Sequence, residues 1–114
     1  MKISVIIVSY NCKAFLDYCL QSVSKALKQI DSEILVIDNC STDGSVEYLK
    51  SKKYDLRIIE NKENLGFSKA NNKAAKLAKG EYLFFLNPDT IIPEDLIESF
   101  FKNKKPNTGI FSFR

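Results

Sequence analysis

Residues 3–11 read ISVIIVSYN, and this stretch decides the fold class. The aliphatic run from Ile3 to Val8 is typical of a strand buried on both faces, as in a parallel sheet, because a half-exposed strand alternates apolar and polar residues. The run ends in three polar residues, Ser9, Tyr10 and Asn11. We therefore predict a buried strand whose carboxyl end carries polar side chains.

The same unit, a buried strand followed by a helix, recurs along the chain. Apolar residues at spacings of three and four between Phe15 and Ile30 predict an amphipathic helix, with Cys19 on its buried stripe. Further strands are predicted at 34–37, 56–59, 82–86 and 109–113, and further helices around 46–49, over the alanine-rich 67–79 ended by Gly80, and from Pro93. This alternation predicts an α/β fold with three layers, α/β/α, in which helices cover both faces of a mostly parallel sheet.

Composition and length fit one domain over residues 1–114. The chain has 17 Lys and Arg against 14 Asp and Glu, 45% of its residues are hydrophobic and 27% are charged. Because the net charge of +3 is small and the lysines are scattered, we expect no nucleic-acid partner, and we interpret Lys102, Lys104 and Lys105 as a solvated helix end. The apolar runs are far shorter than the ~20 residues of a membrane span, so no transmembrane segment is expected.

Cysteine and histidine counts restrict the chemistry. Three cysteines without CxxC spacing do not support a disulfide framework or a zinc site, and they fit reduced thiols in a cytosol. The sequence contains no histidine, which excludes Ser-His-Asp and Cys-His catalysis and histidine-metal sites. We therefore expect a cytoplasmic protein, free or peripheral to the inner face of the membrane, that works through carboxylates, amides, lysines or a metal.

Polar clusters follow four of the predicted strands, at 9–11, 38–39, 61–66 and 87–89. The carboxyl ends of parallel strands meet at one edge of the sheet, where such folds bind ligands, so we expect the clusters to share one site. The four glycines are too far apart for a GxGxxG or P-loop phosphate loop, and no acidic pair follows the first strand. These features argue against dinucleotide dehydrogenases, P-loop NTPases and receiver domains.

Four stretches within these clusters form an ordered series of motifs. They are VSYN at 8–11, VIDNCSTDGS at 36–45, NLGF at 64–67 followed by ANN at 70–72, and LNPDT at 86–90. The series resembles the successive motifs of family 2 glycosyltransferases, in the rhamnosyltransferase-like branch, and it extends across essentially the whole chain. The resemblance implies a truncated GT-A fold in which residues 1–114 are the donor-binding, N-terminal part of a longer catalytic domain.

The resemblance also implies which residues bind a nucleoside diphosphate sugar. Tyr10 would stack on the base and Asp38 would accept the N3–H of uracil or thymine; the alternatives are that Tyr10 fills a strand end and that Asp38 braces a loop or caps a helix. Asp43 is interpreted as structural, offsetting backbone N–H groups in the first turn of a helix. The implied donor-binding residues are Ser9, Tyr10, Asn11, Asp38, Asn39, Gly66, Asn71, Asn72, Asn87 and Asp89.

The stretch Asn87-Pro88-Asp89 matches the DxD position of the family, which implies a Mg²⁺ or Mn²⁺ ion shared between a carboxylate and the donor diphosphate. Asp89 is the predicted metal ligand, with capping of the following helix as the alternative. Asn87 stands where the family has its first aspartate and offers only a neutral amide oxygen. Many relatives also carry an arginine where this chain has Asn71.

Inverting members of the family use an Asp or Glu from a later segment as general base, and no acid of this chain matches that position, so no catalytic residue is assigned. We expect transfer from a UDP- or dTDP-sugar to a glycan or lipid-linked acceptor in polysaccharide or cell-surface glycan synthesis, with the isolated chain inactive. The alternative is a catalytically silent nucleotide-binding or interaction module of the same fold. The last predicted strand would leave an apolar edge through which two copies can pair.

Overall fold

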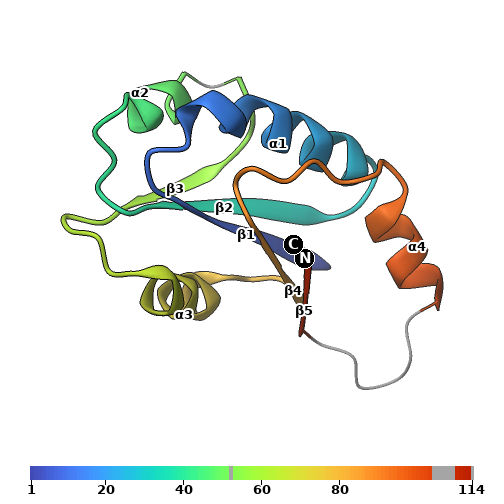
Figure 1. Cartoon of the computed structure of the whole chain (residues 1–114). Coiled ribbons are helices and arrows are strands. Elements are labelled where there is room, and N and C mark those ends of the chain that lie inside the picture. The colour runs from blue at the N-terminus through green and yellow to red at the C-terminus, as the bar shows by residue number, and fades with distance from the viewer. Residues whose placement is uncertain (52, 104–109, 114) are drawn as a thin grey trace.

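The computed structural model of the chain describes residues 1–51, 53–103 and 110–113 (Figure 1). Strands and helices alternate from the first element to the last, which confirms the predicted α/β class. In chain order they are β1 (Ile3–Ser9), α1 (Lys13–Ala26), β2 (Ser32–Asp38), α2 (Ser45–Leu49), β3 (Arg57–Glu60), α3 (Phe67–Leu77), β4 (Tyr82–Leu86), α4 (Leu96–Asn103) and β5 (Ile110–Phe113).

The five described strands form one sheet in the order β3-β2-β1-β4-β5, and every pair of neighbours is parallel. The strand predicted from the ISVIIVSYN stretch lies at the centre of this order. All seven residues of β1 are buried, including Ser4 and Ser9, as the largely aliphatic run predicts for a strand covered on both faces.

Helices cover both faces of the sheet, as predicted for a three-layer fold (Figure 1). Ile3, Val5 and Ile7 of β1 pack in a core cluster with residues of α1, α2 and α4. Ile6 and Val8, which point to the other face, pack in a second cluster with α3. The close packing of α3 depends on small residues, because Ala70 and Ala74 are fully buried against the sheet.

Several predicted element ends are wrong by a few residues. The first helix ends at Ala26 rather than near Ile30, because the chain turns there and Gln29 has a positive φ of 69°. The last helix begins at Leu96, after a turn in which the Leu96 N–H donates to the Pro93 carbonyl oxygen at 3.2 Å. The predicted fifth strand is present as β5, whereas its first residue, Gly109, lies outside the described residues, as do Lys104 and Lys105.

Gly80 does not end α3, which stops at Leu77. The glycine is instead required by the close approach of the α3–β4 connection to β1. A Cβ atom on Gly80 would lie 2.5 Å from the Ser4 nitrogen and 2.6 Å from the Ile3 carbonyl carbon. Backbone atoms of the central strand cannot move aside cheaply, so a residue without a side chain is needed here.

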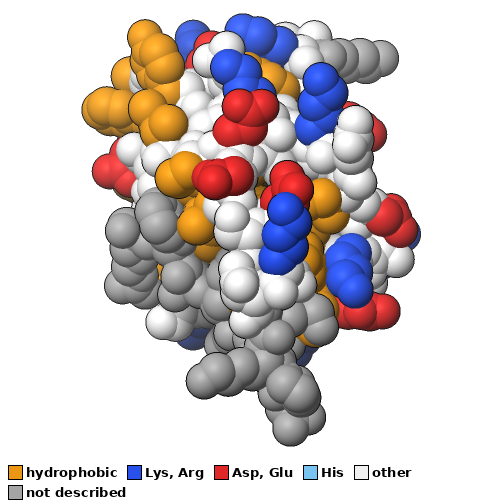
Figure 2. All heavy atoms as spheres, turned by 90° about the vertical axis from the view of Figure 1, so that its right-hand side faces the viewer, with side chains coloured by type: hydrophobic (Ala, Val, Ile, Leu, Met, Phe, Trp, Pro, Cys, Tyr) orange, Lys and Arg blue, Asp and Glu red, His pale blue; other side chains and the backbone are white. Residues whose placement is uncertain are grey.

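Two surface properties bear on possible partners. In the described part of the chain, no helix is both long and apolar enough to span a membrane. Basic and acidic side chains are interspersed on the face shown in Figure 2 and do not separate into a field of one sign. The expectation that nucleic acid is not the partner, made from the small net charge, stays a prediction.

Candidate functional site

The carboxyl ends of β1, β2 and β3 lie side by side because the strands pair in parallel register. Ser9, the last residue of β1, is paired with Asp38, the last residue of β2. The Asn39 N–H donates to the Ser9 carbonyl oxygen at 2.9 Å, and the Asn61 N–H donates to the Asp38 carbonyl oxygen at 2.9 Å. Backbone hydrogen bonds therefore join three successive strand ends, which places these predicted polar clusters at one edge of the sheet.

The hydroxyl of Ser9 is unusual within the described residues. Ser9 is fully buried, and its Oγ is the one buried side-chain polar atom there without a hydrogen-bond partner. An unpaired buried hydroxyl costs about 1–3 kcal/mol, so native proteins contain few of them. A polar group that reaches this strand end from outside would supply the missing partner.

Asp38 is buried, with 1% of its surface exposed, and its carboxylate braces the loop that follows β2. One oxygen accepts the Ser41 backbone N–H at 2.8 Å and the other accepts the Ser41 hydroxyl at 2.6 Å. The loop-bracing alternative is therefore confirmed as one role of this residue. Because each carboxylate oxygen has more than one lone pair, acceptance of a base N–H stays a prediction.

Asn11 joins the β1–α1 loop to the loop that follows β2. Its backbone N–H donates to the Ser41 hydroxyl oxygen at 2.9 Å, and its side-chain oxygen accepts the Thr42 N–H at 2.8 Å. Asn11 adopts a positive φ of 51°, which asparagine tolerates better than most residues. The neighbouring Tyr10 is 48% exposed, so its ring is accessible at the edge of the site.

The loop between β3 and α3 is held by two buried amides. Asn39 accepts the Asn61 side-chain N–H at 2.8 Å and the Leu65 backbone N–H at 3.4 Å, and its own NH₂ donates to the Gly66 carbonyl oxygen at 3.3 Å. Gly66 has a φ of +79°, and a Cβ atom there would meet no atom within 4 Å. The glycine is thus required by its backbone conformation, and the space beside it is open.

Asn71 and Asn72 lie in the first turns of α3, after Gly66. Asn71 is partly buried and Asn72 is exposed. The fold therefore carries both amides on the helix that begins at the same edge of the sheet as the strand ends. Whether they contact a ligand stays a prediction.

The fourth cluster follows β4 in a tight turn. The Thr90 N–H donates to the Asn87 carbonyl oxygen at 3.1 Å, Asn87 is partly buried and Asp89 is exposed. Helix α4 begins only at Leu96, so the alternative that Asp89 caps this helix is wrong. Capping of α4 therefore does not explain why an exposed carboxylate, that of Asp89, follows β4.

The side chains at this turn permit only a limited metal site. Asp89 offers one carboxylate and Asn87 one amide oxygen, which are ligand types that Mg²⁺ and Mn²⁺ accept. Within residues 1–51, 53–103 and 110–113, no three His, Cys, Asp or Glu side chains are grouped closely enough to hold a metal ion. The donor set therefore fits a cation that takes most of its ligands from phosphate oxygens and water rather than from protein side chains.

Cys19 lies behind the same turn and is fully buried, as its position on the apolar stripe predicts. Its Sγ donates to the Asn87 carbonyl oxygen at 3.8 Å. Burial, and then the negative charge of Asp89, raise the pKa of the Cys19 thiol to about 12. The thiol thus stays protonated near neutral pH and is not a nucleophile.

The structural interpretation of Asp43 is confirmed, with a small change of position. Asp43 lies two residues before α2, not in its first turn. Its carboxylate accepts the backbone N–H groups of Lys13 and Ser45, each at 3.0 Å, and also the Ser45 hydroxyl. The Ser45 hydroxyl, followed by the Lys13 N–H, holds the pKa of Asp43 below its ordinary value, so the carboxylate stays charged as it joins the starts of α1 and α2.

Sequence reasoning missed the residues that support the site. Ser41 connects Asp38 to Asn11, and Asn61 connects Asn39 to Lys73, whose ammonium donates to the Asn61 side-chain oxygen at 2.6 Å. Asn61 belongs to the polar cluster predicted at 61–66, directly after β3, but no role in the site was predicted for it. No comparable pattern points to Lys73.

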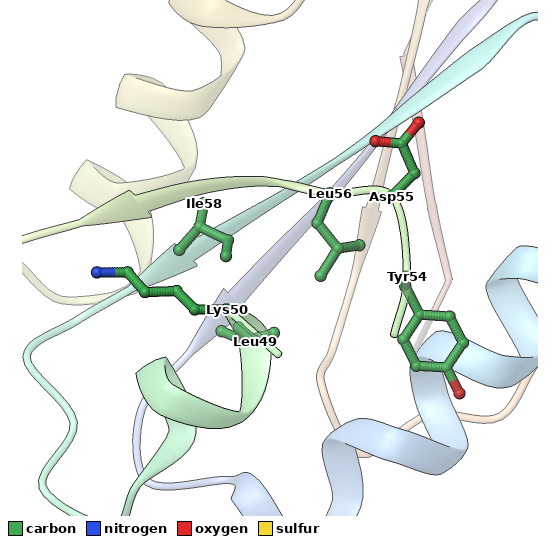
Figure 3. Close-up of a pocket in the computed structure, with 6 residues that line it drawn as sticks. All are labelled: Leu49, Lys50, Tyr54, Asp55, Leu56 and Ile58. Carbon is green, nitrogen blue, oxygen red and sulfur yellow. The ribbon is translucent and has the colours of Figure 1, made fainter. Parts of the chain in front are cut away.

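A separate groove of about 680 Å³ lies where α2 approaches the edge strand β3 (Figure 3). None of the residues that line it belongs to the predicted site. They are Leu49, Lys50, Tyr54, Asp55, Leu56 and Ile58.

Comparison with known proteins identifies the fold family. The sequence matches the family model described as "Glycosyl transferase family 2" over residues 4–111. It is 37% identical over 112 residues to the poly(ribitol-phosphate) beta-glucosyltransferase of Bacillus spizizenii, covering 94% of this chain and 18% of that protein. It is 33% identical over 111 residues to the cholesterol galactosyltransferase of Borreliella burgdorferi, covering 95% of this chain and 30% of that protein.

The fold is also that of a solved glycosyltransferase structure. The structure of residues 1–349 of S. aureus TarS, in complex with UDP-GlcNAc, matches with a TM-score of 0.82 and 29% sequence identity, over 90% of this chain and 30% of that chain. The chain therefore spans less than a third of the length of each of these three proteins. The predicted GT-A fold is confirmed, and the chain belongs to glycosyl transferase family 2.

Proposed function

We propose that residues 1–114 form the donor-binding portion of an inverting glycosyltransferase that uses a UDP- or dTDP-sugar together with Mg²⁺ or Mn²⁺. The observation that carries the proposal is the paired strand end of Ser9 and Asp38, where a buried unpaired hydroxyl lies beside a buried carboxylate. The TarS structure, similar in fold and 29% identical in sequence, holds UDP-GlcNAc, which supports a uridine nucleotide as the ligand.

The nucleoside would lie over the ends of β1 and β2. Asp38 keeps lone pairs beyond those used by Ser41, and a carboxylate can accept the N3–H of uracil or thymine. Tyr10 is exposed and can stack its ring on the base, which also excludes water from the Asp38 contact. Such a contact would favour uracil and thymine over cytosine, because cytosine lacks a hydrogen at N3.

The diphosphate would lie toward the end of β4. Asp89 would hold the cation with oxygen atoms of the diphosphate, and Asn87 would contribute a neutral oxygen at most. When bound, a divalent cation stabilises the negative charge that grows on the departing nucleoside diphosphate. Asn71 and Asn72 can donate hydrogen bonds to phosphate or ribose but cannot neutralise charge.

The acceptor hydroxyl is proposed to belong to a polysaccharide or another cell-surface glycan. The names of the two relatives specify a poly(ribitol-phosphate) and cholesterol, so related chains serve both polymeric and lipid acceptors. No residue of this chain is assigned as the general base.

Isothermal titration of UDP, dTDP and CDP, each with and without Mn²⁺, tests the donor site. We expect UDP and dTDP to bind about tenfold more tightly than CDP, which corresponds to about 1.4 kcal/mol. The Asp38→Asn variant should lose this preference. Ser41→Ala, which removes the hydroxyl bonds to Asp38 and to the Asn11 N–H but leaves the Asp38 carboxylate in place, should keep it. Equal affinity of the wild-type protein for all three nucleotides would refute the role of Asp38.

A catalytically silent nucleotide-binding module is the second candidate, and Asn87 favours it. A neutral amide at the first position of the metal motif binds cations more weakly than a carboxylate does. An assay for hydrolysis or transfer of the donor sugar separates the two candidates. The assay is done on the full-length protein. Binding of the nucleotide without hydrolysis or transfer of the donor sugar would support the silent module.

A further inference from the structure

A chain of hydrogen bonds leads from α3 to the end of β2. The Lys73 ammonium donates to the Asn61 side-chain oxygen at 2.6 Å, and the Asn61 NH₂ donates to the Asn39 side-chain oxygen at 2.8 Å. The Asn39 NH₂ then donates to the Gly66 carbonyl oxygen at 3.3 Å. Asn39 and Asn61 are only 2% and 6% exposed, so water does not readily replace the bond between them, whereas Lys73 reaches Asn61 from the exposed side of α3.

The chemistry of the three side chains makes this chain directional. An ammonium group can only donate, so the oxygen of Asn61 faces Lys73 and its NH₂ faces Asn39. Asn39 then presents its oxygen to Asn61 and its NH₂ to Gly66, an orientation that the Leu65 backbone N–H also favours. Each amide is therefore held in one of the two orientations that exchange the positions of its oxygen and its NH₂ group.

Lys73 differs from the lysines that form surface ion pairs. Lys50 pairs with Glu60 at 2.8 Å and Lys53 pairs with Asp17 at 2.9 Å. Among the ion pairs of the described residues Lys73 has none, and helix α3 contains three lysines and no acidic residue. Its ammonium thus makes a charge-assisted bond to a neutral amide, which gives the bond a positioning role rather than one in charge neutralisation.

We propose that Lys73 is a positioning residue of the donor site. Through Asn61 and Asn39 it holds the end of β2, which carries Asp38, at a fixed separation from the Gly66 turn that begins α3. This inference rests on the proposed function, in which the end of β2 and the Gly66 turn lie on opposite sides of one nucleotide site. A residue that acts only on overall stability would not change nucleotide affinity in folded protein.

The first test needs no nucleotide. Hydrogen exchange of the Leu65 amide, which donates to Asn39, is measured by NMR in the wild type and in Lys73→Met. Lys76→Met is the matched control, because it removes the same charge from the same helix without touching Asn61. We expect faster Leu65 exchange in Lys73→Met only. Equal exchange in the two variants would overturn the proposed connection whether or not the protein binds nucleotide.

The second test measures the Kd for UDP by calorimetry, well below the unfolding temperature of each variant. We expect Lys73→Met to raise the Kd about tenfold, the size expected for loss of a charge-assisted hydrogen bond that supports a site. Lys73→Arg, which keeps a charged donor, should restore affinity to within about threefold of the wild type. A Kd for Lys73→Met equal to that of Lys76→Met, with clear binding by the wild type, would overturn the inference.

The two tests separate the inference from the proposed function. If Leu65 exchange depends on Lys73 but the wild type binds no nucleoside diphosphate, the proposed donor site is refuted and the connection serves another purpose. If the wild type binds UDP and the variants do not differ, the donor site stands and the role of Lys73 is refuted.

Discussion

Replacing Gly80 with alanine should destabilise the protein more than the same change at Gly66. A Cβ atom at position 80 would lie 2.5 Å from the Ser4 nitrogen, 2.6 Å from the Ile3 carbonyl carbon and 2.7 Å from the Ser4 hydroxyl. Two of these three atoms belong to the backbone of β1, which is paired with β2 on one side and β4 on the other. The strand cannot shift without breaking contacts on both sides.

The size of the effect follows from these distances. Carbon atoms make favourable contact at about 3.5 Å or more, so the added methyl group would be about 1 Å too close to β1. Overpacking of a rigid site costs about 1–3 kcal/mol, and displacement of Gly80 would also weaken its 2.8 Å hydrogen bond to the Ser4 hydroxyl. We expect Gly80→Ala to lower the free energy of unfolding by about 3 kcal/mol.

Gly66→Ala is the matched control, because its Cβ atom meets nothing within 4 Å and only its φ of +79° is unfavourable. Together with its ψ of 171°, this places Gly66 in a backbone conformation essentially restricted to glycine, which costs alanine about 1–3 kcal/mol. Urea unfolding of both variants, followed by far-ultraviolet circular dichroism, gives the free energies from midpoint and slope. If Gly80→Ala were as stable as Gly66→Ala, close approach to β1 would not be the reason for glycine at position 80.

For three further substitutions, the structure predicts the direction of the effect on stability or on nucleotide affinity. Burial raises the pKa of Glu33, but hydrogen bonds from the Ser4 hydroxyl, the Lys79 N–H and Arg57 outweigh burial and lower the pKa below its ordinary value of 4.5. The ionised Glu33 therefore stabilises the folded protein above pH 4.5, and this contribution is lost as the pH falls through the folded-state pKa. Urea unfolding of Glu33→Gln should accordingly give a flatter dependence on pH in the acid range than the wild type; a parallel curve would contradict this. Cys40 has a φ of 66°, so Cys40→Gly should raise the free energy of unfolding by roughly 0.5 kcal/mol in the same assay, and a decrease would argue against strain there. Asp89→Asn should abolish the Mn²⁺-dependent gain in UDP affinity in calorimetry and leave metal-free binding unchanged, whereas an undiminished gain would remove Asp89 from the metal site.

Much of the fold could be predicted because its strongest signals are local. The aliphatic run from Ile3 to Val8 indicates a strand buried on both faces, and such a strand occurs where helices cover both sides of a sheet. The role of Gly80 could not be predicted this way. Its partner Ser4 is 76 residues away, and in sequence a glycine after a helix has the same pattern as a helix terminator.

The location of the candidate site could be predicted for a topological reason. Parallel strands place their carboxyl ends together, so residues that follow different strands meet without any local sequence signal for the contact. Ser9 and Asp38 illustrate this, being 29 positions apart and paired in register. The side-chain hydrogen bonds could not be predicted, because the partner of each polar group comes from another loop, as Ser41 does for both Asp38 and Asn11.

These contacts change how substitutions at the site must be interpreted. The side chains of Asp38, Asn11 and Asn39 all hold loops together, although each was predicted to bind the donor. Tyr10 and Asp89, by contrast, are exposed. Loss of nucleotide affinity in a variant of the first group therefore combines a lost ligand contact with a displaced loop, and a variant such as Ser41→Ala is needed to separate the two. Variants of Tyr10 and Asp89 report ligand contact more directly, so the position of the nucleotide is best established from these two residues.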